Sequence, residues 1–210
     1  MNEQYEEKRT KGPLIYAIIG VSVLIIAVAG SAYAYFTASA TADNNVSGKA
    51  LQVNLGITLS KTAPTTNIST KDSLVPIYDG SVTGHTSQLQ QAATASCKDS
   101  KNYNVCQIYK VEITNTGTDA TNVDTTLSLT KNSVTNLKWA TMSAATTVST
   151  VQDSTSGNIA TSTALSANGK ETLYFMVYIN NTGNAQYDTG DFSGTVTVTA
   201  SNGAHVEATF

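Results

Sequence analysis

The sequence is poor in charged residues, proline, cysteine and tryptophan. Only 13% of its 210 residues are Asp, Glu, Lys or Arg, and the net charge is −3, whereas soluble domains usually carry about 25% charged residues. Because a phosphate-binding surface needs clustered basic side chains, this composition argues against a nucleic-acid partner. Three prolines and 14 glycines exclude a collagen-like chain. The length fits one modest globular domain plus an N-terminal segment.

The longest stretch without charge covers residues 12–42, which contain no Asp, Glu, Lys or Arg. Three basic residues precede its apolar part, and small residues follow, including the A-x-A pattern formed by Ala32 and Ala34. This order is typical of a secretory signal peptide. We therefore predict export, with residues 1–34 as the signal segment and cleavage before Tyr35.

An uncleaved anchor is the main alternative for this segment. Residues 14–34 reach the ~20 apolar residues that a membrane-spanning helix needs, with the N-terminus inside. A buried helix of a cytosolic protein is less well supported, because a globular helix of this length needs a polar face and this segment has none.

Two cysteines, Cys97 and Cys106, flank a short polar stretch. In an exported chain such a pair favours a structural disulfide, which would contribute about 2–3 kcal/mol in the chain-entropy model. Zinc is the alternative, but the chain has only two histidines, His85 and His205, and no recognisable ligand spacing. We predict a disulfide and no metal site.

Apolar and polar residues alternate along much of the remaining chain, which indicates half-buried strands. The clearest patterns cover residues 51–59, 105–114, 123–129, 173–179 and 192–199. Residues 173–179 are apolar on both faces, as expected of a central strand covered on two sides. Asn202-Gly203 predicts a hairpin between residues 192–199 and 204–210.

Shorter strand candidates are residues 74–78, 137–142 and 159–165, and residues 87–96 have the composition of a short helix. Turn signals stand at residues 115–117, 156–158, 167–169 and 181–183. Many short strands with almost no helix predict an all-β, two-sheet β-sandwich over residues 49–210. Trp139 is expected in its core.

Catalytic patterns are weak. Asp188-Thr189-Gly190 matches the D-T-G of aspartic proteases, but a second copy is missing and the stretch is typical of a turn. Calcium binding by Asp188 and Asp191 is a further alternative, although calcium needs about six to eight oxygen ligands. The sequence has no H-E-x-x-H motif. We therefore predict no enzyme activity and no cofactor.

A family resemblance rests on both ends of the chain. Residues 30–37 read Gly-Ser-Ala-Tyr-Ala-Tyr-Phe-Thr and are followed by an Asn pair at 44–45 and by Leu51-Gln52-Val53. This junction resembles the TasA/camelysin family of exported proteins, whose signal peptides are cleaved by a SipW-type peptidase. Residues 192–203 and 208–210 are similar to the C-terminus of small secreted relatives, and residues 111–117 to the strand and turn at the family's centre.

The resemblance implies a jelly-roll-like sandwich that is released by the SipW-type peptidase and polymerises into extracellular biofilm-matrix fibres. In such fibres the freed N-terminal strand of one subunit completes a sheet of the next. Residues 35–48 would form this strand and a linker, and the donor residues would be Tyr35, Phe36, Thr37, Ala38, Ser39, Ala40 and Thr41. Camelysin has been described as a metalloprotease, but this chain has no zinc motif to carry that activity.

The implied partners are other copies of the chain, the signal peptidase, and the membrane before cleavage. Two other functions stay open at the level of sequence. One is a membrane-anchored surface adhesin or carbohydrate-binding β-sandwich. The other, more remote, is a secreted protease that uses Asp188 or Asp191.

Overall fold

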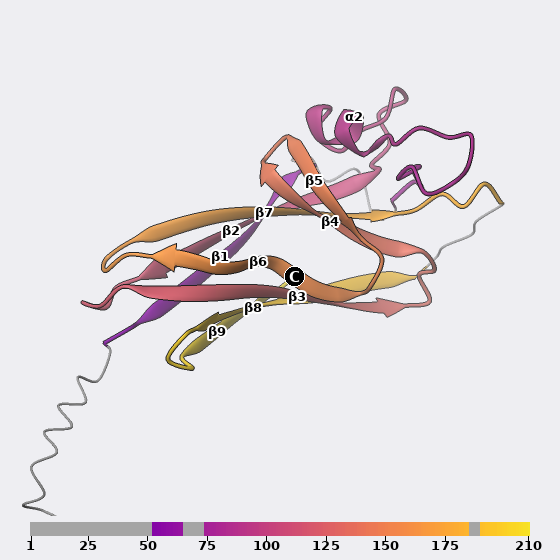
Figure 1. Ribbon diagram of the computed structural model, residues 1–210. Coiled ribbons are helices and arrows are strands. Elements are labelled where there is room, and N and C mark those ends of the chain that lie inside the picture. Colours follow the sequence, from indigo (N-terminus) through magenta and orange to yellow (C-terminus); the bar gives the residue numbers. More distant parts are fainter. Residues whose placement is uncertain (1–51, 65–73, 185–189) are drawn as a thin grey trace, which may run out of the picture. The chain divides into compact units, whose positions relative to one another are not determined.

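The computed structural model describes residues 52–64, 74–184 and 190–210. These residues form an all-β sandwich of two sheets, with one short helix in the described ranges (Figure 1). The predicted fold class is confirmed. The predicted signal segment, residues 1–34, and the predicted strand and linker, residues 35–48, lie outside the described residues.

Antiparallel pairing connects all neighbouring strands in both sheets. The described strands are β1 (Leu55–Ala63), β2 (Cys106–Asn115), β3 (Thr121–Asn132), β4 (Leu137–Ala144), β5 (Thr147–Gln152), β6 (Ser156–Leu165), β7 (Lys170–Ile179), β8 (Asp191–Ala200) and β9 (His205–Thr209). One sheet has the order β1-β2-β7-β4-β5 and the other the order β6-β3-β8-β9.

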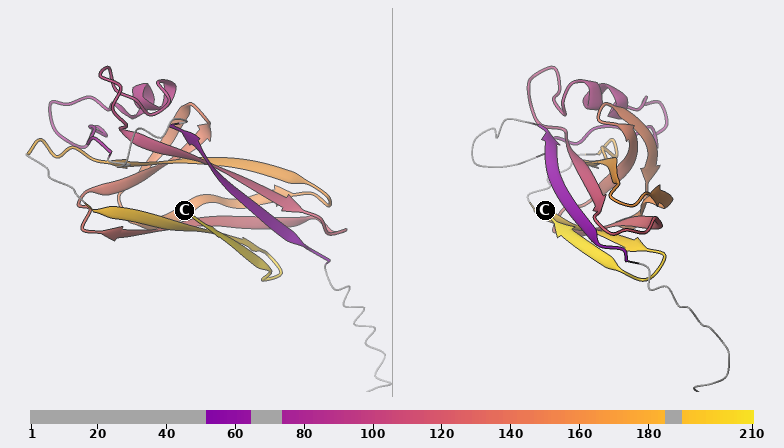
Figure 2. Two further views of the ribbon diagram at one scale, coloured as in Figure 1. Left: turned by 180° about the vertical axis from the view of Figure 1, so that it is seen from behind. Right: turned by 90° about the vertical axis from the view of Figure 1, so that its left-hand side faces the viewer.

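The strand order is that of a jelly roll except along one side. The runs β2-β7-β4-β5 and β6-β3-β8 follow the alternation of a double Greek key between two sheets. The place beside β8 that the first strand of a jelly roll would take is filled by β9, which pairs with β8 through the predicted hairpin. β1 pairs with β2 instead, so that β1 and β9 are edge strands on the same side (Figure 2).

The main core lies between the two sheets. Odd-numbered residues of β2 and β7 meet apolar residues of β3 and β8 there, and Trp139 on β4 is fully buried, as expected. The aromatic rings of Tyr109 and Phe175 stack at a centroid distance of 5.1 Å. Because side chains alternate between the two faces of a strand, each sheet presents an apolar face to the shared interior.

A second core cluster covers the other face of the five-stranded sheet. Even-numbered residues of β2 and β7, such as Ile108, Met176 and Tyr178, contact buried residues of the helix α2 (Leu89–Thr94). The Cys97–Cys106 disulfide is buried beside them, with a Cα–Cα distance of 4.9 Å. The predicted disulfide, the predicted short helix and the two-sided burial of residues 175–179 are confirmed.

Three local predictions were wrong. Strand β5 was not expected, because most of its residues are polar and its edge position buries few of them. The turn expected at residues 156–158 is the start of β6, where a Cβ on Gly157 would lie 3.0 Å from the Trp139 ring. Residues 74–78 form only an isolated bridge, between Ile77 and Asn180, because they cross from one sheet edge to the helix rather than joining a ladder.

Candidate functional site

Two edge strands, β1 and β9, border what we call the open side of the sandwich. Within the described ranges β1 pairs with β2 alone and β9 with β8 alone. The Thr116 N–H donates to the Asn54 carbonyl at 2.9 Å. Since alternate residues bond across an antiparallel ladder, the N–H and C=O groups of Ile57 and Leu59 point away from β2. Such an edge is a template for a further strand.

The other sheet also has unpaired backbone on this side. Gly194 and Phe210 exchange two backbone hydrogen bonds, at 3.0 and 3.1 Å, and the ladder between β8 and β9 ends with them. Strand β8 extends further, to Asp191. By the same alternation, the N–H and C=O groups of Phe192 point toward the space beyond the end of β9, where no described residue pairs with them.

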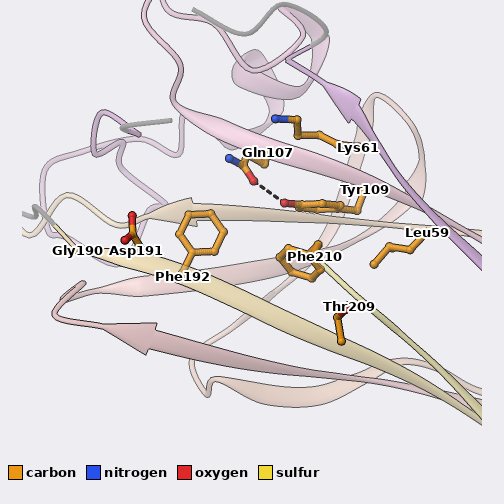
Figure 3. A pocket seen from close by; sticks show the side chains of 9 residues that line it. All are labelled: Leu59, Lys61, Gln107, Tyr109, Gly190, Asp191, Phe192, Thr209 and Phe210. Carbon is orange, nitrogen blue, oxygen red and sulfur yellow. Dashed lines mark hydrogen bonds between the residues drawn. The ribbon is translucent and has the colours of Figure 1, made fainter. Parts of the chain in front are cut away.

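A pocket of about 470 Å³ occupies this space (Figure 3). Its centre is aromatic, since the Tyr109 ring lies 4.1 Å from the Phe210 ring, centroid to centroid. The Tyr109 hydroxyl donates a hydrogen bond to the Gln107 side chain, the dashed line in Figure 3. The lining residues are Leu59, Lys61, Gln107, Tyr109, Gly190, Asp191, Phe192, Thr209 and Phe210. The open side thus combines a pocket of aromatic and polar lining with strand edges that no described residue pairs.

Gly194 explains why the Phe210 ring lies inside the sandwich. A Cβ on Gly194 would stand 2.4 Å from a ring carbon of Phe210, far closer than two unbonded carbons approach. The missing side chain lets the ring lie flat against β8 and reach Tyr109 and Phe175. One wall of the pocket therefore depends on a glycine in the neighbouring strand.

We call the opposite side, bordered by the edge strands β5 and β6, the closed side. Its strand edges are capped or irregular. The side-chain amide of Gln90 on α2 donates to the Thr146 carbonyl at 2.7 Å and accepts from the Val148 N–H at 3.0 Å. The Gln90 amide thus makes the two hydrogen bonds that a neighbouring strand would make at the start of β5. A glutamine side chain therefore occupies the edge that β5 would otherwise present.

Strand β6, the other edge of the closed side, is irregular. Its pairing with β3 contains two register shifts, and Ser162 has a φ of 50°. The Ser162 N–H is taken by the Asp124 carboxylate at 2.7 Å. Bulged strands with occupied amides resist edge-to-edge pairing. The Trp139 indole N–H also bonds the Ser154 carbonyl, at 3.0 Å, in the connection from β5 to β6.

A buried ion pair ties loops to the outer face of the five-stranded sheet. The Asp79 carboxylate accepts from the Lys138 ammonium at 2.9 Å and from the Tyr178 hydroxyl at 3.2 Å, and its side chain is 1% exposed. Lys138 also pairs with Asp153, which follows β5, at 2.7 Å. The network joins the crossover around Asp79 to the end of the closed side.

The electrostatics of this network favour its ionised form. Burial by itself raises the pKa of Asp79, but hydrogen bonds from Ser81 and Lys138 outweigh it and hold the pKa below its usual value. Burial lowers the pKa of Lys138, and Asp153 and Asp79 together raise it above its usual value. Burial and the charge of Asp79 raise the pKa of Tyr178, so this hydroxyl stays a donor. These groups form a structural tie with both charges paired.

The structure places only some of the residues singled out in the sequence. The expected cleavage site (Ala32, Ala34 and Tyr35), the expected donor strand (residues 35–41) and Asp188 lie outside the described residues. Asp191 lines the pocket of the open side. His85 and His205 are exposed, and the His85 ring stacks on Tyr78 at 3.9 Å.

The described ranges contain neither a metal-binding cluster nor a membrane-spanning helix. There is no group of three His, Cys, Asp or Glu side chains in them that could hold a metal ion. None of their helices has the length and apolar character needed to cross a membrane.

The sequence did not predict the pocket of the open side or the capping of the β5 edge by Gln90. Tyr109, Phe192 and Phe210 were assigned to strand faces, but their convergence depends on β1 and β9 meeting on one side, which no local pattern encodes. Gln90 lies in a stretch recognised only by its helical composition. Its role as a cap depends on β5, the strand that the sequence pattern missed.

Comparisons with known proteins do not assign a family. No protein-family model and no curated protein matches the chain. Among solved structures, it is similar to a FixG-related protein from Vibrio parahaemolyticus, with 9% identity over 74% of this chain and 92% of that chain at a TM-score of 0.31. It is also similar to the sporulation control protein Spo0M from Bacillus subtilis, with 8% identity over 76% and 47% of the two chains at a TM-score of 0.35. Similarities this low carry no argument about function.

Proposed function

We propose that this chain is an exported structural subunit that forms extracellular biofilm-matrix fibres by strand addition. In this proposal residues 35–41 of one copy add to the open side of the next copy. The role is structural rather than catalytic. The resemblance of the N-terminal junction to the TasA/camelysin family supports it, and so does the Cys97–Cys106 disulfide, which is typical of exported proteins.

The dimensions of donor and acceptor agree. An extended strand gains about 3.3 Å per residue, so the seven residues 35–41 reach about 23 Å, which fits within the nine-residue edge of β1. Main-chain hydrogen bonds to outward groups such as those of Ile57 and Leu59 would provide affinity. An aromatic side chain of the donor, Tyr35 or Phe36, would enter the pocket beside Tyr109 and Phe210.

This geometry gives a filament rather than a closed dimer. The donor and the acceptor are different surfaces of the same chain, so each contact is heterologous and leaves a free donor at one end and a free acceptor at the other. Cleavage by a SipW-type signal peptidase before Tyr35 would release the donor. Until then the subunit would stay attached to the membrane, which makes cleavage the step that starts assembly.

One observation carries the proposal: among the described edges, β1 and β9 flank a pocket with aromatic and polar lining, and no described residue pairs with their outward backbone groups, whereas the start of β5 is capped by Gln90. A monomer without a strand partner gains nothing from such an edge, since exposed edges invite unwanted pairing.

Electron microscopy of two purified chains tests the proposal. A chain that begins at Tyr35 should form fibres, and a chain that begins at Ala42 should stay monomeric because it has an acceptor but no donor. Mixed in at a small fraction, the chain from Ala42 should shorten the fibres, because each copy that accepts a donor stops growth at that end.

A matched control separates capping from dilution. The chain from Ala42 that also carries Phe192→Lys has a charge in the pocket and should no longer shorten the fibres. Fibres formed equally well by the chain that begins at Ala42 would contradict the proposal, as would shortening that is unchanged by Phe192→Lys.

A further inference from the structure

A second groove, of about 510 Å³, lies at the end of the molecule that carries α2 and shares no residue with the pocket of the open side. Three segments form it: the crossover at residues 75–78, the exposed face of α2, and the loop closed by the disulfide (Figure 1). Its volume falls within the roughly 300–1,000 Å³ of small-molecule sites.

The walls of this groove are fixed in place. In the disulfide loop, the Asp99 carboxylate accepts from the backbone N–H groups of Lys101 and Tyr103 at 2.9 and 2.8 Å. The crossover is held by Val75, whose N–H bonds the Asn104 carbonyl at 2.8 Å, and by Ile77, which exchanges backbone bonds with β7 and Asn181. A ligand would therefore meet a largely preformed surface and pay little ordering entropy.

Apolar exposure is concentrated at this groove. Val75 and Tyr103 are the exposed large hydrophobic residues of the described chain, at 38% and 57%. Val75 lines the groove, and Tyr103 projects from the disulfide loop whose residues 98–100 line it. Tyr78, held by its stack on His85, adds a second aromatic ring. One tyrosine, Tyr78, thus lines the groove, and a second, Tyr103, is exposed on the loop whose residues 98–100 line it.

The polar lining is rich in amides and has no net charge. Gln88, Gln91 and Asn181 contribute side-chain amides, and the charges of Lys98 and Asp99 balance each other. An amide offers both a donor and an acceptor, which matches vicinal hydroxyl groups. An ionic ligand finds no excess of opposite charge here.

We propose that this groove binds a neutral polysaccharide. A sugar ring has a face of C–H groups, which packs against aromatic rings such as those of Tyr78 and Tyr103, and an edge of hydroxyls, which pairs with the amides of Gln91 and Asn181. A fibre subunit with this site would crosslink fibres to matrix polysaccharide. The site stands whether or not the chain polymerises, since it lies apart from the open side.

A peptide is less suited to the groove than a sugar. A bound extended peptide takes its affinity from a row of unpaired backbone groups, but along the crossover the N–H groups of Val75, Ile77 and Tyr78 are already bonded. Recognition here must come from side chains, and these are tyrosines and amides.

Biolayer interferometry tests this site. The chain that begins at Tyr35 would be applied to immobilised dextran, mixed-linkage β-glucan, galactan and chitin oligosaccharide, with polyglutamate and heparin as charged controls and an immobilised random peptide library as the competing class. We expect saturable binding to at least one neutral glycan. Tyr103→Ala and Gln91→Ala should each weaken it by about tenfold, the equivalent of about 1.4 kcal/mol.

Two variants serve as controls. Tyr103→Phe keeps the ring and should retain binding within about threefold, the equivalent of about 0.65 kcal/mol. Glu207→Ala, on β9, should leave binding unchanged. No binding to any neutral glycan, binding only to the peptide library or the charged polymers, or glycan binding insensitive to Tyr103→Ala and Gln91→Ala would each overturn the proposal. Because the chain that begins at Ala42 keeps the groove, equal glycan binding by it separates this site from fibre assembly.

Discussion

The closed and the open side of the sandwich treat their edge strands in opposite ways. On the closed side Gln90 bonds the Thr146 carbonyl and the Val148 N–H at the start of β5, and β6 is bulged. On the open side the first seven residues of β1 are regular, its register shifts only after Lys61, and its outward groups meet no described partner. The same chain thus covers part of one edge and leaves the other without a described partner, which is the arrangement that the proposed strand addition requires.

The two sides also differ in how the interior is sealed. Trp139 and Gly157 fill the closed side tightly, and Lys138 ties its end to the crossover through Asp79. On the open side the rings of Tyr109 and Phe210 leave a pocket of about 470 Å³ beside them. Among the described residues, the capped edge thus lies beside the buried Trp139, and the edge without a described partner lies beside the pocket.

The largest effect on stability should come from Trp139→Ala. Removing this fully buried ring from the closed side should lower the free energy of unfolding by about 3–5 kcal/mol, because a cavity and an unpaired Ser154 carbonyl remain. Urea unfolding followed by circular dichroism measures the change. Phe192→Ala, in the half-open pocket, is the matched control and should cost clearly less. Equal losses of unfolding free energy in the two variants would contradict the difference in packing between the two sides.

Loss of the disulfide should come next. Cys97→Ser combined with Cys106→Ser should destabilise the protein by about 2–3 kcal/mol through the entropy of the short loop. Fibre formation should persist under conditions where the variant is folded, since neither cysteine lines the pocket of the open side. Comparison with the wild-type protein under reducing agent checks that the effect comes from the bond itself. A folded variant that no longer assembles would show that the two regions are coupled.

Some parts of the fold and of the candidate site could be predicted from the sequence, and others could not. Alternation predicted most strands correctly, because each buried one presents a continuous apolar face to an interior, as β7 does on both sides. The disulfide was predicted from two cysteines that flank a short polar stretch, in a chain expected to be exported. β5 was not predicted because most of its residues are polar and none of them is fully buried. The pocket was not predicted because it depends on β1 and β9 meeting on one side of the sandwich, which no local pattern encodes.

Lowering the pH should remove the contribution that the ionised Asp79 carboxylate makes to stability. The pKa of Asp79 is held below its unfolded value, so its contribution is present above about pH 4 and is lost as the pH falls through its lowered folded-state pKa. Asp79→Asn should cost about 1–2 kcal/mol at pH 7, with less acid dependence below pH 4 than the wild-type protein shows. Urea unfolding from pH 2 to 7 gives both quantities. Parallel pH profiles for the two proteins would contradict this assignment.

The smallest effect on stability, but the most informative for the comparison, should come from Gln90→Ala. It removes two hydrogen bonds at the exposed β5 edge and should cost about 0.5–1.5 kcal/mol. Amide exchange at Val148 should accelerate, and the chain that begins at Ala42 should begin to self-associate through the uncovered edge. Gln91→Ala, one residue further along α2, is the control and should leave Val148 unchanged. If neither exchange nor association changes, Gln90 does not guard this edge.

The most direct test of the account is amide hydrogen exchange of the chain that begins at Ala42, with and without a synthetic peptide of residues 35–41. Strand addition at the open side predicts that the peptide slows exchange at Ile57 and Leu59 and leaves Val148 unchanged. A scrambled peptide of the same composition should protect neither region. Protection at Val148, or no protection along β1, would contradict the claim that the open side receives the strand of another copy.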